Sequence, residues 1–516
     1  MSERTRLCLQ ILAVALVLGV TGDALLRAEP WGLNAALWTA ALAAGLLGLL
    51  RDRRDPQPSP GCRWLLVPVV LFGAALAGRD STALKLLNVW AVLVSLALLT
   101  LHPRLERLHL ATLTEQMKAG MLAGIHAGLG MLFLLLGDLK WPEVSRERWS
   151  RPALAVARGL ALALPPLAVF AALFMAADAV FSALVKRAIH INLGELAVHV
   201  LVFAFVAWVA GGYLRAVFFA QENRLLFPVS ARPLTLGEVE VGIVLGLMNL
   251  LFLAFVLVQV RYFFGGSAWV QATAGLTYSE YARRGFFELV TVAALVLPLL
   301  LLGHWLLDPG GAAAQRLFRW LASVQIALLL VIMASAFQRM RLYQREFGLT
   351  EQRLYPTAFM AWLAVVFAWF VWTVLRGRRE RFAFGALGAG YALVLGLNLL
   401  NPDALIVRTN LARAGAGRSF DAAYAASLSA DALPPLLEGL PALKTQDRCL
   451  VAARLSKRWP AAEFSDWRAW SYSRAAARDA LQANDSRLRP AGCPSGPEGS
   501  GVEHPPSPHA TSPNPD

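Results

Sequence analysis

Long apolar runs follow one another from the N-terminus to about residue 400, and short polar segments separate them. A bilayer core about 30 Å thick requires about 20 apolar residues of α-helix to cross it. Counting such runs predicts 11 or 12 membrane-spanning helices. They lie approximately at 7–25, 31–50, 64–77, 84–101, 121–136, 153–175, 196–219, 239–262, 285–307, 317–337, 358–375 and 382–400. The pattern therefore predicts an all-α, polytopic membrane protein.

After residue 400 the pattern changes, because charged side chains are mixed into shorter amphipathic stretches. The stretch from Trp467 to Leu481 repeats its large side chains at helical spacing, and Asp466 can cap the first turn. The end of the chain is rich in Pro and Ser and lacks apolar residues to bury, which predicts disorder. We expect four segments: N-terminal transmembrane helices (1–137), the main transmembrane domain (138–401), a small extramembrane helical region (402–489) and a disordered tail (490–516).

The composition excludes a soluble enzyme of ordinary domains. Hydrophobic residues make up 57% of the 516 residues, charged residues 16%, and the mean hydropathy is +0.52. Soluble domains carry about 25% charged residues. The net charge of +14 comes from short basic clusters between apolar runs, which is typical of contact with lipid headgroups rather than nucleic acid. The expected location is the bacterial cytoplasmic (inner) membrane, with the lipid bilayer as a partner.

The basic clusters also bear on orientation. Arg4, Arg6 and the cluster at 51–63 favour a cytoplasmic N-terminus, and a cytoplasmic Arg376–Arg381 turn would place the region after residue 400 outside. The two assignments agree only for particular numbers of spans between the basic clusters, so the sequence leaves the orientation open. We favour an outside location for the region after residue 400. In an oxidising compartment, Cys449 and Cys493 can form a disulfide; the alternative is two unrelated thiols. A membrane or envelope protein partner would then face this region.

A polar stretch before the ninth predicted span contains the most conspicuous candidate site. Glu280, Arg284 and Glu288 are spaced i, i+4 and i+8, and Tyr281 shares part of that helix face. One hypothesis is a ligand-binding or gating site at a membrane face, because ionisable groups inside apolar spans are costly and usually face a cavity or a partner. The alternative is an interfacial anchor in which Tyr278 and Tyr281 belong to the aromatic belt.

Asp178, Glu195 and His199 form a second candidate cluster near the sixth and seventh predicted spans. Glu195 and His199 are four residues apart and share a helix face, a spacing that a metal pair or a proton relay uses. Two further ligands are not identifiable in the sequence, so a hydrogen-bonded pair at a helix end is favoured over a metal site. No metal and no cofactor are predicted.

Nucleotide-binding and hydrolase motifs are missing from the sequence: there is no Walker loop, Gly-x-Ser-x-Gly, His-Glu-x-x-His or dinucleotide fingerprint. We therefore assign no catalytic residues and lean against an enzyme. The leading hypothesis is binding or transport of a solute through a polar site within the helix bundle. The alternatives are a non-catalytic regulatory or scaffold subunit with an envelope partner, and a membrane enzyme acting on lipid-linked substrates.

A polar connection between the tenth and eleventh predicted spans includes Gly348, which is expected to end one helix, and Thr350, which can cap the next. Together with the Tyr278–Leu289 stretch, it resembles a family of bacterial polytopic membrane proteins catalogued as a domain of unknown function. The resemblance extends from about residue 150 to 482 and implies an integral membrane protein without a known reaction. Its pieces are Asp178–Phe181, Tyr278–Leu289, Phe347–Glu351 with Arg353 and Tyr355, Asn401–Asp403 with Asn410, Leu428–Asp431 and Asp466–Arg468.

Overall fold

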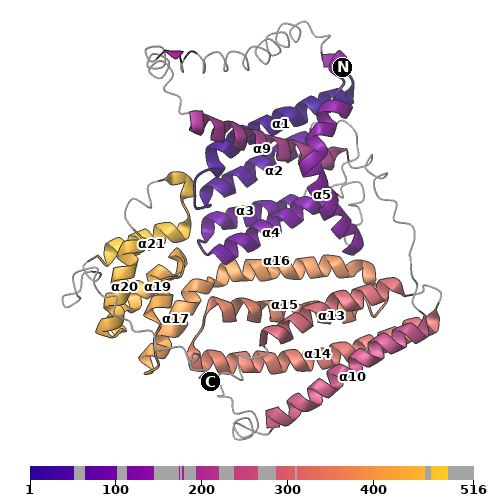
Figure 1. Cartoon of the computed structure of the whole chain (residues 1–516), viewed down its shortest axis with the longest axis vertical. Coiled ribbons are helices and arrows are strands. Elements are labelled where there is room, and N and C mark those ends of the chain that lie inside the picture. Colours follow the sequence, from indigo (N-terminus) through magenta and orange to yellow (C-terminus); the bar gives the residue numbers. More distant parts are fainter. Residues whose placement is uncertain are drawn as a thin grey trace, which may run out of the picture.

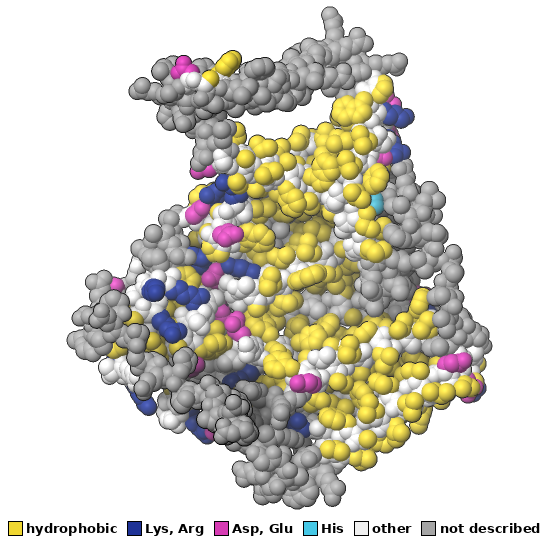
Figure 2. All heavy atoms as spheres, in the orientation of Figure 1, with side chains coloured by type: hydrophobic (Ala, Val, Ile, Leu, Met, Phe, Trp, Pro, Cys, Tyr) yellow, Lys and Arg dark blue, Asp and Glu magenta, His cyan; other side chains and the backbone are white. Residues whose placement is uncertain are grey.

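The computed structural model describes residues 1–51, 64–100, 113–144, 174, 177–178, 193–219, 237–264, 286–307, 311–459, 466–485 and 488. All elements in these ranges are helices. Among them, ten helices are long and apolar enough to cross a membrane. The predicted all-α, polytopic fold is confirmed, and the surface in Figure 2 carries hydrophobic side chains over most of the spanning helices, as contact with lipid requires.

Six of the helices form a closed ring in the N-terminal half (Figure 1). Each helix packs on the next in the order α1, α2, α3, α4, α5 and α9, and α9 packs back on α1. A π-helical turn at Leu134–Asp138 continues α5, and the short α6 (Trp141–Val144) follows. The ring helices are α1 (Glu3–Leu26), α2 (Leu33–Arg51), α3 (Leu66–Gly78), α4 (Thr82–Leu99), α5 (Leu113–Phe133) and α9 (Leu193–Phe218).

A second group of spanning helices lies beside the ring (Figure 1). Its longest member, α14, packs against α10, α13 and α15, and large apolar side chains such as Phe318, Phe367 and Phe370 fill the core between them. Helix α16 packs against α15 and also against α3 and α4, so it joins the two groups. The helices are α10 (Glu238–Phe264), α13 (Phe286–Leu306), α14 (Ala312–Phe347), α15 (Glu351–Thr373) and α16 (Phe382–Leu400).

The region after α16 folds into five α-helices that share a core with the spanning helices. Leu433, Leu436 and Val451 are fully buried there, and the same cluster includes Leu84 of α4 and Leu354 of α15. The helices are α17 (Pro402–Gly415), α18 (Ala422–Ala425), α19 (Leu433–Gly439), α20 (Thr445–Arg458) and α21 (Tyr472–Ala483), with 3-10 turns η6 (Ala430–Ala432), η7 (Leu440–Ala442) and η9 (Trp467–Ala469). We call this the C-terminal region.

One predicted span is as short as its apolar run at 64–77 indicates, one continues as a longer helix, and one lies outside the described residues. Helix α3 has 13 residues, fewer than a span needs. Helix α14 has 36 residues and continues ten positions past the predicted end at 337, because no helix-breaking residue occurs before Gly348. The predicted span at 153–175 falls almost wholly outside the described residues, as does the tail at 490–516.

The two ends of the bundle differ. We call the end that carries the C-terminal region the tail face; the α3–α4 turn lies there, and Leu33 at the start of α2 donates to the Trp470 carbonyl at 2.8 Å. At the opposite face, the rings of Trp64 and Phe384 lie 6.0 Å apart, so the start of α3 lies beside the start of α16. The opposite face therefore carries the start of α1, the end of α2 and the Arg376–Arg381 turn.

Candidate functional site: a polar junction at the tail face

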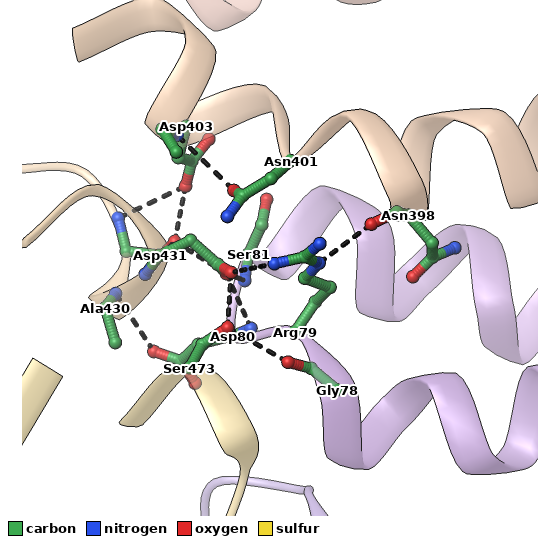
Figure 3. Close-up of polar contacts among 12 residues, drawn as sticks. Gly78, Arg79, Asp80, Ser81, Asn398, Asn401, Asp403, Ala430, Asp431 and Ser473 are labelled. Atoms are coloured by element: carbon green, nitrogen blue, oxygen red, sulfur yellow. Dashed lines mark hydrogen bonds and ion pairs between the residues drawn. The ribbon is translucent and has the colours of Figure 1, made fainter. Parts of the chain in front are cut away.

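Polar side chains from four parts of the chain meet where the C-terminal region contacts the spanning helices (Figure 3). They come from the α3–α4 turn, the connection from the end of α16 into the first turn of α17, the η6 turn and the start of α21. We call this cluster the polar junction. Its members are Arg79, Asp80, Ser81, Asn398, Asp403, Ser429, Asp431 and Ser473.

The chain enters the junction through a sharp change of direction after α16. Asn401 adopts a left-handed conformation with φ of 53°, which asparagine tolerates better than most residues. Its side-chain oxygen then accepts from the backbone N–H of Ala404 at 3.4 Å and caps α17, and Pro402 occupies the first turn of that helix. This turn places Asp403 at the tail face directly after the span.

Asp431 is the most completely bonded group of the junction, and its side chain is 0% exposed. One carboxylate oxygen accepts from the backbone N–H groups of Asp80 at 2.7 Å and Ser81 at 3.1 Å. The other accepts from the Arg79 guanidinium at 3.4 Å and from the Ser473 hydroxyl. A single carboxylate thus connects the η6 turn to the α3–α4 turn and to α21.

Side chains of the α3–α4 turn also form hydrogen bonds to the C-terminal region and to α16. Asp80 accepts from the backbone N–H of Ala430 at 3.3 Å and from the Lys85 ammonium group at 2.7 Å. Arg79 donates through Nε to the Asn398 carbonyl at 2.8 Å. The side-chain amide of Asn398 is buried and exchanges hydrogen bonds of 3.1 and 2.8 Å with the amide of Asn88, which joins α16 to α4. The α3–α4 turn is therefore fixed to α16 as well as to the C-terminal region.

Asp403 has a different environment although it belongs to the same cluster. One of its oxygens accepts from the Ser429 hydroxyl at 2.5 Å and from the Ser429 backbone N–H at 3.3 Å. The other oxygen is buried without a hydrogen-bond partner, and the residue is 1% exposed. Burial raises the pKa of the Asp403 carboxyl to about 6, and the negative charges of Glu351 and Asp431 act in the same direction, against the Ser429 hydrogen bonds. Asp403 can therefore change protonation near neutral pH.

The α14–α15 turn lies against α17 beside the junction. Asn410 accepts from the Leu349 backbone N–H and donates to the Leu349 carbonyl, each at 2.8 Å. Arg413 donates to the Glu346 carbonyl at the end of α14 at 2.5 Å. Gly348 has φ of 80°, and an added Cβ would lie 2.5 Å from both the Asn410 and Arg413 side chains. The close approach therefore requires glycine for space as well as for its backbone conformation.

The predicted ligand or gating residues are mostly not described. Tyr278, Glu280, Tyr281 and Arg284 lie outside the described residues. Glu288 lies in the first turn of α13 and is exposed. Whether these five side chains converge on a ligand stays a prediction.

The second predicted cluster is described in part, with Glu195 and His199 one turn apart on α9. His199 at the start of α9 contacts Asp23 of α1, with 2.6 Å between Nδ1 and the carboxylate oxygen, and the Arg27 guanidinium lies 2.7 Å from the same nitrogen. Glu195 is exposed one turn earlier, and Asp178 is exposed in a segment of which few residues are described. In the described part of the chain, no three His, Cys, Asp or Glu side chains gather as metal ligands would.

The predicted disulfide also stays a prediction, because Cys493 lies outside the described residues. By contrast, the structure brings together three of the segments that carried the family resemblance: Phe347–Glu351, Asn401–Asp403 and Leu428–Asp431. Sequence reasoning missed the Arg79–Ser81 turn and Ser473. A short polar segment between two apolar runs was the available signal for the turn, but nothing in the sequence indicated its partners.

Fold and junction together define a class: a polytopic α-helical membrane protein with a helical region docked on one face of its bundle. The model of a family described as Domain of unknown function (DUF4153) matches residues 66–439. This is more than half of the chain, and the chain belongs to that family. The match runs from the start of α3 to the end of α19 and includes the polar junction except Ser473. Neither a curated protein nor a solved structure matches the chain.

Proposed function

We propose that this protein is a non-catalytic scaffold of the bacterial cytoplasmic membrane, in which the spanning helices hold the C-terminal region rigidly for a protein partner. The observation that carries the proposal is the bonding of Asp431. A carboxylate has about four lone-pair positions, and donors from Arg79, Asp80, Ser81 and Ser473 occupy them while excluding solvent. Such a group is suited to fixing two parts of a protein together rather than to reacting with a substrate.

The orientation that follows from the basic residues supports an external partner. Arg4, Arg51 and the Arg376–Arg381 turn belong to the face opposite the C-terminal region. Lys and Arg in short loops favour the cytoplasmic side. The tail face then lies outside, where a partner in the cell envelope can reach it.

The surface of the C-terminal region indicates the chemistry of that partner. Two of its carboxylates, Asp403 and Asp431, are buried in the junction, so basic side chains dominate its exposed part. Figure 2 shows Lys and Arg side chains gathered over these helices. The exposed basic residues in the described part of this region are Arg408, Arg418, Lys444, Arg454, Lys457, Arg458 and Arg478. We infer that the partner presents an acidic surface.

Cross-linking in cells tests the scaffold proposal. The double variant Lys444→Glu/Lys457→Glu reverses two exposed charges and should reduce the yield of the cross-linked partner about tenfold. The control Glu438→Lys/Asp479→Lys makes the opposite change at exposed positions of the same region and should retain the partner. Equal yields from the two variants, at equal protein abundance, would contradict an acidic partner on this surface.

Solute binding or transport is the second candidate function, and the buried oxygen of Asp403 without a partner favours it. A group of this kind near Glu351 can hold a proton or a cation. Thermal-shift screening of the purified protein against small solutes would test this function. A ligand that stabilises wild type and the Glu238→Gln control, but not Asp403→Asn, would support binding at Asp403. A ligand whose effect is lost in Glu288→Gln instead would support the predicted site at α13; Glu238 is likewise exposed in the first turn of a span.

A further inference from the structure

The ring of six helices encloses a cavity of about 580 Å³. All six helices contribute side chains to its wall. Ligand pockets in proteins measure about 300–1,000 Å³, and an apolar cavity of about 150 Å³ already binds benzene. This cavity is therefore large enough for a flexible hydrocarbon chain.

The wall offers hydrocarbon surface and satisfied polar groups. Tyr213 donates its hydroxyl to the Leu96 carbonyl at 2.9 Å, and Thr39 donates to the Ala36 carbonyl at 2.9 Å. The indole N–H of Trp38 donates to the Leu18 carbonyl at 3.2 Å. These donors are used within the protein, so a polar solute entering the cavity would exchange its hydrogen bonds to water for contacts with apolar side chains. That exchange is unfavourable, and it selects an apolar ligand.

The cavity opens toward the bilayer between α4 and α5. On α4, Trp90 is 64% exposed and Leu93 is 50% exposed, although both line the cavity. On the α5 side, Gly120 and Gly124 line the cavity, and an added Cβ at either position would meet nothing within 4 Å. Since both helices are candidate spans, the molecules in front of this opening are the hydrocarbon chains of lipids.

The end of the cavity nearest the tail face lies beside a cationic group. Leu26 at the end of α1 lines the cavity, and the next residue is Arg27. The Arg27 side chain is 30% exposed; its guanidinium lies 4.0 Å from the Asp23 carboxylate, and the His199 ring lies beside it. A phosphate headgroup at this position would meet the guanidinium while its chain occupies the cavity.

We propose that the ring of α1–α5 and α9 binds a membrane phospholipid, with one acyl chain in the cavity and the headgroup near Arg27. No residue of the polar junction lines the cavity, although the C-terminal region contacts the α1–α2 turn beside it through Trp470 and Arg468. The ligand of the ring is then a lipid of the surrounding bilayer.

Photo-cross-linking in reconstituted membranes tests this site. A phosphatidylglycerol with a photoactivatable group in one acyl chain is incorporated, and labelled peptides are mapped by mass spectrometry. In wild type, the label should concentrate on residues 89–97 and 120–127, which contain lining residues of α4 and α5. Gly124→Leu places a side chain in the cavity and should reduce this labelling about tenfold.

The matched control is Gly128→Leu. Gly128 lies one turn further along α5, an added Cβ there also meets nothing within 4 Å, and the residue does not line the cavity. Labelling of this variant should equal that of wild type. Equal labelling of the two leucine variants would overturn the proposal. So would wild-type labelling no stronger at the cavity than at exposed Leu250 of α10 and Leu295 of α13, which would indicate surrounding lipid only.

If Gly124→Leu fails to fold, a second variant tests the same cavity. Gly120→Leu enters the same cavity from one turn earlier, where an added Cβ again meets open space. The distribution of the label in wild type is also a test that needs no variant.

Discussion

Asp403 and Asp431 are buried aspartates of the same junction with opposite hydrogen bonding. The oxygens of Asp431 are matched by donors from the α3–α4 turn and α21, whereas one oxygen of Asp403 is buried without a partner. The Leu428–Asp431 segment was already part of the family resemblance, yet its spacing could not indicate a bond to Ser81, 350 positions earlier. Side-chain partners at this range depend on how helices pack, which local patterns do not determine.

Removing the Asp431 carboxylate should loosen the C-terminal region. Asp431→Ala leaves the Arg79 guanidinium and two backbone N–H groups of the α3–α4 turn without their acceptor, and we expect a loss of about 3 kcal/mol in the free energy of unfolding. Thermal unfolding and limited proteolysis of the purified protein would measure it. Asp479→Ala is the control, because that side chain is 70% exposed, and it should change stability by less than about 0.5 kcal/mol. Similar losses in both variants would contradict the role given to Asp431.

Asp403 should make stability depend on pH. Its pKa rises from 3.8 to about 6 on folding, so the folded state binds more protons than the unfolded state between these values. Stability therefore falls as the pH rises from about 4 to about 6, and changes little above that range on account of this group. The expected difference is of order 3 kcal/mol, because each pKa unit corresponds to about 1.4 kcal/mol.

The variant Asp403→Asn removes this titration while keeping an oxygen for the Ser429 bonds. The difference in unfolding temperature between the variant and wild type should shift in favour of the variant from pH 4 to pH 6 and then stay constant. A difference that is flat over the whole range would show that Asp403 titrates as an ordinary exposed carboxyl.

At the scale of elements, the bilayer makes spanning helices predictable because it demands about 20 apolar residues for each crossing. Helix ends were predictable where a residue has a local reason to stop the helix. Gly348 was expected to end one helix and Thr350 to cap the next. Helix α14 ends at Phe347 and α15 begins at Glu351, and Thr350 occupies the N-cap position without a side-chain hydrogen bond. The predicted apolar span ended at residue 337, and α14 continues beyond it with polar side chains up to the break expected at Gly348.

The α14–α15 turn gives a prediction in which backbone strain and steric contact can be separated. Gly348→Ala should cost about 1–3 kcal/mol for a backbone conformation (φ 80°, ψ 179°) that essentially only glycine adopts, and more because the new Cβ displaces Asn410 and Arg413. Gly417→Ala is the matched control, since Gly417 has φ of 81° but no atom within 4 Å of an added Cβ. Thermal unfolding should therefore show a larger loss for the first variant. Equal losses would mean that α17 moves aside without cost.

At the scale of the whole molecule, α16 connects two helix groups and leads into the C-terminal region at the tail face. The sequence predicted that this region is helical. It did not decide on which side of the membrane the region lies, because the two sets of basic clusters required different numbers of spans. In the structure, the start of α1 and the Arg376–Arg381 turn lie at one face, so the two assignments agree. The closure of a ring by α9 had no local signal, since it depends on packing between distant segments.

Reporter fusions test this orientation. Alkaline phosphatase fused after residue 403 should be active and a fluorescent protein at the same point should be dark, because the tail face is expected outside. Fusions within the Arg376–Arg381 turn should give the reverse result. The same reporter signal at both points would contradict the crossing of α16 between them.

The bond between Asp431 and the α3–α4 turn also has a consequence for synthesis of the chain. Ser81 and Asp431 are 350 positions apart, so the turn is made and inserted long before its acceptor exists. At roughly 5–20 residues per second, the wait lasts tens of seconds. During that time the amides of the turn have only water as an acceptor. A chain that stops before Asp431 therefore lacks the acceptor that fixes this turn to the C-terminal region.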